Sequence, residues 1–240
     1  MGGGGITSLK DLIIESKTNT VKDGNYTITY SASDSFNGVI PSYPWEATIR
    51  NDNCWISRSN EYYFPSWWQV DLGRVENNIC KFSFASGYSV NKCIGCKDYE
   101  LSYSLDGLNF NKIYSGTYVA RTANSNFSWK YQTEYCNFNT ISARYFRITI
   151  LTVGPFITYQ AASVAEARLY ARIIRLYLKE SDNNIYGSVD NEITQITTLD
   201  TWNNSSIEEK KNFFLITNNV LSIDQLKSLG KFKVLNEPKN

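Results

Sequence analysis

The five cysteines are the residues whose type and spacing could most readily do chemistry. Cys93 and Cys96 form a C-x-x-C motif, and Cys54 and Cys136 could complete a four-thiolate zinc site with them. A disulfide within the Cys93–Cys96 loop and a set of plain reduced thiols are the other two interpretations. Because five is odd, a disulfide framework would leave one thiol over. No βαβ pattern surrounds the motif, which disfavours a redox active site.

The chain contains no histidine, and this removes every mechanism that uses imidazole as a base or metal ligand. Glycoside hydrolysis needs two carboxylates that face each other across a cleft. Asp71, Asp106 and Glu166 fall in scaffold-like motifs and form no recognisable pair. A serine or cysteine nucleophile activated by lysine stays formally possible. We therefore predict that the protein is not an enzyme.

Composition excludes several other classes of protein. Of the 240 residues, 42% are hydrophobic and 15% aromatic, which is enough to bury a core. A net charge of +1 gives no general attraction to nucleic acid or acidic lipid, so we predict neither as a partner. No apolar run reaches the roughly 18 residues of a membrane span, and we predict no membrane insertion. Residues 1–19, with four glycines after Met1, are predicted to be a flexible leader without a secretion signal.

The elements that must position any site are predicted to be mostly short strands. Apolar and polar residues alternate in several segments, as half-buried strands require. These segments are residues 26–30, 67–72, 79–84, 99–104, 144–150 and 164–170. Asp106-Gly107 is a hairpin turn signal after one of them. The pattern predicts an all-β sandwich or jelly roll over residues 20–171.

Residues 172–240 differ in composition and contain no cysteine. The sequence predicts three strands there, over 173–178, 185–189 and 231–235. Two helices are predicted between them, one beginning near Ser205 and one over 222–229 that ends at Gly230. We expect a small α+β module that docks on a partner, because so short a chain is only marginally stable alone.

Several segments of the first region, in order along the chain, resemble the discoidin or coagulation-factor C-type domain and its family 32-like carbohydrate-binding relatives. They are Phe36-Asn37-Gly38, Trp55-Ile56-Ser57, Pro65-Ser66-Trp67-Trp68-Gln69-Val70-Asp71-Leu72-Gly73, Tyr99-Glu100-Leu101-Ser102-Tyr103-Ser104-Leu105-Asp106-Gly107-Leu108-Asn109-Phe110, Ala143-Arg144-Tyr145-Phe146-Arg147-Ile148 and Ala162-Ser163-Val164-Ala165-Glu166-Ala167-Arg168-Leu169-Tyr170. The resemblance implies a galactose-binding-like β-sandwich jelly roll. It also implies a ligand on the loops at one end, often beside a structural calcium ion.

The loops of this domain are rich in the residue types that sugar recognition needs. A sugar ring lies with its C–H surface on an exposed aromatic face, and rigid polar side chains bind its hydroxyl groups. The candidate sugar-binding residues are Trp45, Trp55, Arg58, Tyr88, Asn91, Lys92, Phe156 and Tyr159. Loop packing for the aromatic residues, and ordinary solvated charge for the lysine, are the alternatives.

The sequence departs from the galactose-binding relatives at two places. Those relatives have a histidine where this chain has Ile56, and an arginine where it has Ser86 and Gly87. Either the ligand differs, or the site has been rebuilt from other residues, or the domain has no sugar site. The resemblance therefore predicts the fold better than it predicts the ligand.

A structural calcium ion is the one cofactor that the resemblance implies. Its candidate ligands are the loop that contains Asp34 and Asn37, together with Glu166. Calcium prefers six to eight oxygen ligands, with charged carboxylates among them. Asn37 stands where the family usually has an aspartate, so one charge is missing and binding should be weaker. The alternative is that Glu166 pairs with a neighbouring arginine.

The leading hypothesis is a non-catalytic adhesion protein that recognises a bacterial cell-surface glycan. Residues 173–178 and 228–235 are similar to small modules in tail and baseplate proteins of phages of Gram-positive bacteria. The similarity implies that the protein is part of a phage tail or tail-like particle, bound to other particle proteins through 172–240. Such a protein is made in the bacterial cytoplasm without a signal peptide and leaves the cell in the virion on lysis.

Two alternatives to this hypothesis stay open. The protein could be a purely structural assembly protein of the particle, with no glycan site. It could also be a carbohydrate-binding fragment of a secreted glycosidase, with Gly2–Gly5 as a cloning remnant.

Overall fold

The computed structural model divides the chain into two compact units, one formed by Asp11–Ala171 and the other mainly by Arg172–Asn240. The structure describes residues 9–35, 37, 42–49, 54–57, 64–86, 93–118, 133–153, 160–189, 192–217, 221–236 and 238. Within these ranges no helix is long and apolar enough to cross a membrane.

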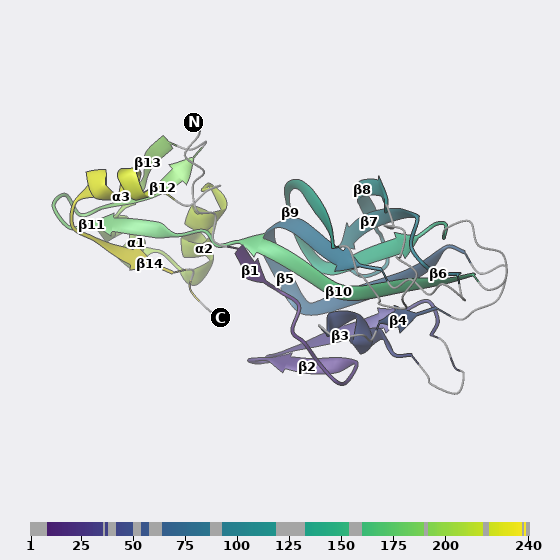
Figure 1. The fold of residues 1–240 in the computed structure, drawn as a ribbon. Coiled ribbons are helices and arrows are strands. Elements are labelled where there is room, and N and C mark those ends of the chain that lie inside the picture. Colours follow the sequence, from purple (N-terminus) through teal and green to yellow (C-terminus); the bar gives the residue numbers. More distant parts are fainter. Residues whose placement is uncertain are drawn as a thin grey trace. The chain divides into compact units, whose positions relative to one another are not determined.

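The first unit consists of strands and one short 3-10 helix (Figure 1). They are β1 (Leu9–Asp11), β2 (Thr20–Asp23), β3 (Tyr26–Ala32), η1 (Pro44–Thr48), β4 (Trp55–Ile56), β5 (Ser66–Ala85), β6 (Cys93–Gly95), β7 (Asp98–Ser104), β8 (Asn111–Thr117), β9 (Glu134–Ile150) and β10 (Gln160–Arg172). The hydrogen-bonded order is β1-β10-β5-β9-β7-β8, with β2 on β3, β3 on β5, and both β4 and β6 on β10.

The two long strands β5 and β9 build both layers of a sandwich. They pair antiparallel along their whole length, with shifts of register between Asp71 and Lys81. β3 and β7 pair with the part of this ribbon before the shifts, at residues 68–71 of β5 and 145–150 of β9. β10 pairs with the part of β5 after them, residues 79–85. The bent ribbon therefore contributes one half to each layer.

Backbone conformation explains where β5 bends. Gly73 and Asn78 both have a positive φ, of 73° and 59°. A Cβ atom at position 73 would lie 2.5 Å from the carbonyl oxygen of Thr27, so a side chain there would collide with β3. Position 73 therefore requires a positive φ and no side chain, and glycine satisfies both because it has no Cβ and adopts positive φ readily.

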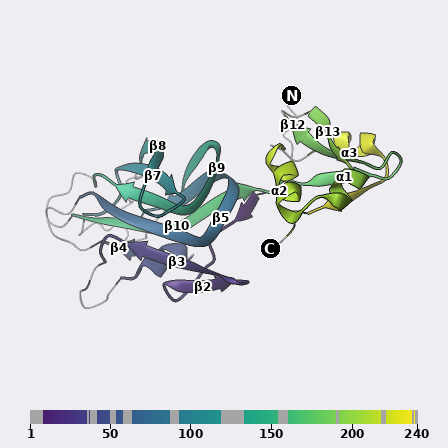
Figure 2. The same cartoon turned by 180° about the vertical axis from the view of Figure 1, so that it is seen from behind.

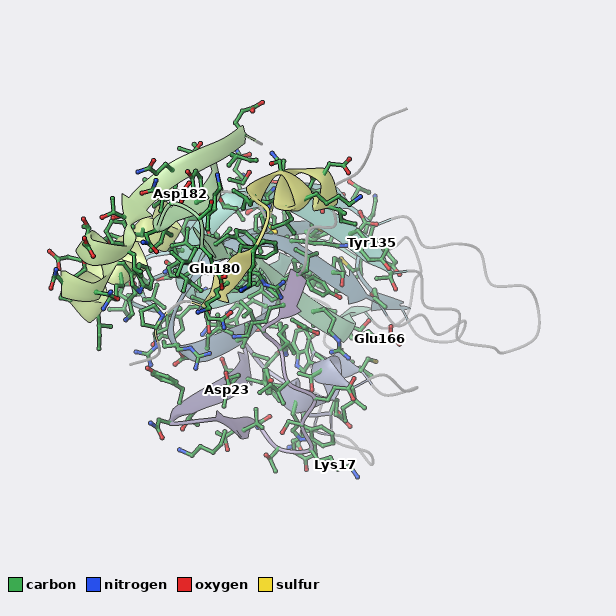
Figure 3. The ribbon with its side chains drawn as sticks, turned by 90° about the vertical axis from the view of Figure 1, so that its left-hand side faces the viewer. Lys17, Asp23, Tyr135, Glu166, Glu180 and Asp182 are labelled. Atoms are coloured by element: carbon green, nitrogen blue, oxygen red, sulfur yellow. The ribbon has the colours of Figure 1, made fainter. Side chains whose placement is uncertain are left out.

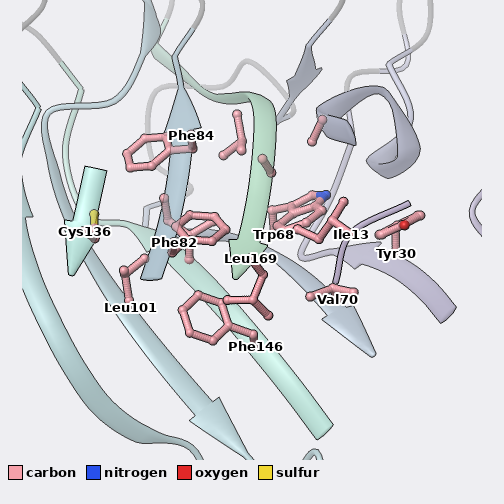
Figure 4. Close-up of a cluster of buried hydrophobic side chains, with 14 of the residues drawn as sticks. Ile13, Tyr30, Trp68, Val70, Phe82, Phe84, Leu101, Cys136, Phe146 and Leu169 are labelled. Atoms are coloured by element: carbon pink, nitrogen blue, oxygen red, sulfur yellow. The ribbon is translucent and has the colours of Figure 1, made fainter. Parts of the chain in front are cut away.

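The core lies between the two layers (Figure 4). Trp68 and Val70 from the first half of β5 are fully buried, as are Phe82 and Phe84 from its second half. The rings of Phe82 and Phe146 lie 5.1 Å apart, which joins the two layers. The predicted alternation is thereby confirmed, and so is the all-β sandwich.

The first unit begins earlier than residue 20, where we predicted it to start. Leu12 and Ile13 lie in the core, with 4% and 5% of their surface exposed. The hydroxyl of Tyr30 donates to the carbonyl oxygen of Ile14 at 2.6 Å. The short apolar run here has no alternation that would have marked it as a strand, and only packing against the sandwich gives it a place.

The hairpin of β7 and β8 forms where it was predicted, but its connection is longer than a two-residue turn. The carboxylate of Asp106 organises this loop by accepting hydrogen bonds from the backbone nitrogens of Leu108 and Asn109 and from the hydroxyl of Ser104. These bonds lower the pKa of Asp106 well below its usual range.

The second unit is a four-stranded antiparallel sheet with helices, in the order β13-β12-β11-β14 (Figure 2). Its elements are β11 (Leu176–Lys179), β12 (Asn184–Val189), β13 (Glu192–Thr198), α1 (Leu199–Asn204), α2 (Ile207–Leu215), α3 (Ile223–Leu229) and β14 (Phe232–Leu235). The predicted α+β module is confirmed, while β13 and α1 were not predicted.

Alternation along the strands divides the apolar residues of this sheet between two faces. Leu176 and Ile185 pack with residues of α1 and α2, including Phe214. Tyr177 packs on the other side with residues of α3, including Leu229. The second unit therefore has a core on each face of its sheet.

Candidate functional site

The short helix η1 carries the described part of the predicted ligand loops. The indole Nε1 of Trp68 donates to the carbonyl oxygen of Pro44 at 2.8 Å. At the other end, a nitrogen of Arg168 donates to the carbonyl oxygen of Thr48 at 2.6 Å. Ser42 lies just before η1, and its hydroxyl connects this segment to β4. It accepts a hydrogen bond from the backbone nitrogen of Ile56 and donates one to the carbonyl oxygen of Cys54. The core thus holds η1 at both ends.

Two aromatic rings lie parallel at the start of η1. The ring centroids of Tyr43 and Trp45 are 6.1 Å apart, and the angle between the ring planes is 11°. Tyr43 is 44% exposed, whereas Trp45 is half-buried and packs against the core. The backbone nitrogen of Trp45 donates to the side chain of Asn19, which fixes the pair to the N-terminal segment. A flat, partly exposed aromatic surface of this kind can receive the C–H face of a sugar ring.

Trp55 does not belong to a binding surface, which corrects our prediction. Its ring is fully buried. The indole Nε1 donates to the carbonyl oxygen of Asp34 at 3.0 Å and to the hydroxyl of Ser35 at 3.2 Å. Its backbone pairs with Val164 of β10. Trp55 is therefore a structural residue that joins the Asp34 loop to β10.

The structure describes only two of the predicted sugar-binding residues, Trp45 and Trp55. Trp45 lies on η1, and sequence analysis missed Tyr43 as its partner, although the two residues are separated by one proline. The other predicted residues lie outside the described part of the chain. These are Arg58, Tyr88, Asn91, Lys92, Phe156 and Tyr159.

The predicted calcium ligands lie on two segments that Trp55 connects. Glu166, labelled in Figure 3, lies in a bulge of β10 between Ala165 and Arg168, and its φ is +48°. Its carboxylate forms no ion pair or hydrogen bond with the residues that the structure describes, so the alternative pairing with an arginine is not seen there. Asn37 is exposed. No cluster of three or more acidic or cysteine side chains occurs among the described residues.

A model of the F5/8 type C domain matches residues 27–167. The chain belongs to the F5/8 type C domain family. The match spans the strands from β3 to β10 and includes η1, but it leaves out residues 11–19, which the structure shows packed on the same domain. No curated protein matches the chain.

Several solved structures are similar to this F5/8 type C domain. CpGH89CBM32-5 from Clostridium perfringens, in complex with GalNAc-β-1,3-galactose, is 21% identical with a TM-score of 0.48, over 60% of this chain and 95% of that chain. CBM32-3 from a C. perfringens family 31 glycoside hydrolase is 21% identical, with a TM-score of 0.46, over 59% and 88%. The family 32 module of C. perfringens NanJ, in complex with galactose, is 20% identical, with a TM-score of 0.45, over 60% and 93%.

Four cysteines of the F5/8 type C domain, Cys54, Cys80, Cys96 and Cys136, are buried free thiols. Because Cys96 is free, the predicted loop disulfide is not formed; the side chain of Cys93 lies outside the described residues. Cys54 packs with Ala85, in a different cluster from Cys96 and Cys136, and the predicted zinc site is not assembled by the described residues. Burial raises the pKa of Cys54 to about 12 and of Cys136 to about 11.

We expect Cys54 and Cys136 of the native protein to resist alkylation by iodoacetamide at about pH 8, because the thiolate is the nucleophile and a raised pKa keeps the thiol protonated there. Mass spectrometry after short exposure would measure labelling at each position, and the same protein in denaturant is the control. Rapid labelling of either cysteine in the folded protein would contradict the buried, protonated state.

Proposed function

We propose that the protein is a non-catalytic carbohydrate-binding protein that recognises a cell-surface glycan. The family match supports the general class of domain. The observation that carries the proposal is the parallel stack of Tyr43 and Trp45, held at both ends of η1 by Trp68 and Arg168. A rigid aromatic platform binds a sugar with little loss of side-chain entropy, because its orientation is set before the ligand arrives.

Replacing Tyr43 with alanine is expected to weaken glycan binding by about 30-fold, as for a residue that contributes about 2 kcal/mol to an interface. The free energy of unfolding should change by less than about 0.5 kcal/mol, because the side chain is an exposed surface group. A glycan array with bacterial wall polysaccharides would identify the ligand, and titration calorimetry would measure the variants.

Tyr135→Ala is the matched control, because Tyr135 on β9 is also exposed, at 57%. It should leave glycan binding unchanged. The binding proposal fails if no polysaccharide binds and Trp45→Ala alters only stability; the domain would then be a structural assembly protein.

We propose further that the second unit attaches the domain to a phage tail or tail-like particle. The support is the resemblance to small tail and baseplate modules that the sequence of residues 173–178 and 228–235 suggests. In addition, edge strands β13 and β14 have no further strand beside them among the described residues. Such edges can pair with a strand of another protein. Density-gradient fractionation of a lysate of the producing bacterium tests this: the chain should sediment with particles. Recovery as part of a secreted glycosidase would contradict it.

We propose also that Glu166 and the Asp34–Asn37 loop hold a calcium ion. The carboxylate of Glu166 supports this assignment, since it forms no ion pair or hydrogen bond with the described residues and can serve as a charged oxygen ligand from the bulge of β10. Trp55 contacts both ligand segments through the Asp34 carbonyl oxygen and Val164. A bound calcium ion would fix the loop to β10 and neutralise the carboxylate.

Calcium at about 100 times its dissociation constant is expected to stabilise the protein by about 2.7 kcal/mol, because it binds only the folded state. Thermal unfolding with calcium and with EDTA would measure the difference. Glu166→Gln should abolish the calcium effect, while Glu100→Gln, on β7, should retain it. Equal melting temperatures with calcium and with EDTA would rule the site out.

A further inference from the structure

Arg147 occupies an unusual position on the outer face of the layer that contains β3 and β7. It lies on β9 opposite Gln69 of β5 and Ser102 of β7. The guanidinium carbon is 4.4 Å from the ring centroid of Trp67 and 3.7 Å from that of Phe110. Two aromatic rings therefore hold the guanidinium plane in one place.

The hydrogen bonds of Arg147 leave one edge of its guanidinium group available. Both Nε and Nη2 donate to a single neutral acceptor, Oε1 of Gln69, at 3.0 and 2.8 Å. Nη1 donates to no atom of the described residues. The edge formed by Nη1 and Nη2 is, besides the Nε–Nη2 edge, one of the two through which a guanidinium group can bind a carboxylate by two parallel hydrogen bonds.

Arg147 also lacks the counter-charge that its neighbours have. Among the described arginines of residues 11–171, Arg74, Arg144 and Arg168 each form an ion pair with a carboxylate, and Arg147 forms none. Its nearest carboxylates along the paired strands are already engaged, because Asp71 binds Arg144 in a two-bond contact and Glu100 binds Lys112.

Burial disfavours the charged form of Arg147, and no carboxylate among the described residues offsets this effect. Desolvation lowers its pKa from the ordinary value, whereas hydrogen bonding to Asp71 raises the pKa of Arg144 on the same strand. A fixed, partly desolvated positive charge without an anion binds an incoming anion more favourably than a fully solvated arginine does, because part of the desolvation has already occurred on folding.

We propose that Arg147, between Trp67 and Phe110, binds the carboxylate of an acidic sugar residue. Nη1 and Nη2 would each donate a hydrogen bond to one of the two carboxylate oxygens, and the two aromatic rings would contact the apolar part of the sugar. This subsite is separate from the Tyr43–Trp45 platform. It depends on the proposed function only for the identity of the molecule that carries the carboxylate.

The experiment titrates the full chain with sodium glucuronate and, as the neutral counterpart, with glucose. Nuclear magnetic resonance follows the Nε–H signal of Arg147 and the indole N–H signal of Trp67. We expect saturable shifts with glucuronate, at a dissociation constant on the order of 1–10 mM, and no saturable shift with glucose. Arg147→Met should weaken glucuronate binding at least about tenfold, and added salt should weaken it in the wild type.

Three controls make the result decisive. Arg144→Met removes a neighbouring arginine that already has a carboxylate partner, and it should leave glucuronate binding unchanged. Arg147→Lys keeps the charge and loses the planar guanidinium group, so it should bind glucuronate more weakly than the wild type. This variant replaces Arg147→Met in the experiment if Arg147→Met does not fold. Tyr43→Ala should retain glucuronate binding even if it loses a neutral glycan, which separates this proposal from the failure of the proposed function.

Two outcomes would overturn the proposal. One is the absence of a saturable, Arg147-dependent shift with glucuronate. The other is tighter Arg147-dependent binding of glycerol 3-phosphate than of glucuronate, which would assign the site to a phosphate group instead.

Discussion

Replacing Arg168 with methionine is expected to lower the free energy of unfolding by about 1.5–3 kcal/mol, because a buried guanidinium group loses its charge-assisted hydrogen bonds to two partly exposed carboxylates. Arg168 is only 4% exposed. It donates to Glu15 at 2.5 Å and to the carbonyl oxygen of Thr48 at 2.6 Å, and its Nε lies 3.3 Å from Asp11. One side chain thus fastens the N-terminal segment and η1 to β10.

Chemical denaturation with urea would measure the loss, and Arg144→Met is the matched control. The side chain of Arg144 is 39% exposed, against 5% for Arg168, so its loss should cost less than about 1 kcal/mol. Arg168→Met should also weaken binding at the Tyr43–Trp45 platform, because Thr48 at the end of η1 loses its anchor. A variant within about 1 kcal/mol of the wild type would show that the network contributes little.

Replacing Trp68 with alanine should cost about 3–5 kcal/mol, the range for removing a large aromatic side chain from a core. The ring is fully buried and lies parallel to Tyr30, with centroids 6.0 Å apart. Its Nε1 is the hydrogen-bond donor to Pro44 of η1. The substitution would leave both a cavity and an unpaired carbonyl oxygen.

Trp68→Phe separates these two effects. It retains much of the packing but loses the hydrogen bond to Pro44, which should cost about 1–2 kcal/mol and loosen η1. Trp67→Ala is the control on the same strand. Trp67 is half-buried on the outer face, so its removal should cost about 1 kcal/mol. Equal losses for Trp67→Ala and Trp68→Ala in urea denaturation would contradict the assigned inward and outward faces.

Local sequence pattern was enough to predict most strands of the sandwich. Alternation in the segments around Val70, Phe82 and Phe146 reports directly which side chains face inward, because successive residues of a strand point to opposite sides. The same pattern could not show that β5 continues through Gly73 and Asn78 as one bent strand. That bend follows from pairing with β9 and from the close approach of Thr27.

The candidate site was less predictable than the fold. Composition pointed to aromatic loop residues, and of these Trp45 lies on a partly exposed platform while Trp55 is buried. Both are tryptophans in loop-like sequence, and no local feature separates them. The burial of Trp55 is decided by residues distant in the sequence, because its indole donates to Asp34 and its backbone pairs with Val164. Trp45, by contrast, stacks on its near neighbour Tyr43 and stays partly exposed.

By itself, the sequence determined the strand-rich first region, the mixed second region and the family, because alternation, capping residues and motif order are local properties of the chain. Only the tertiary structure decided which of the described arginines of residues 11–171 has no carboxylate partner among the described residues. Asp71 and Arg144 are far apart in the sequence, and strand register brings them together. The same register places Arg147 opposite Gln69, so its guanidinium group donates to a neutral acceptor.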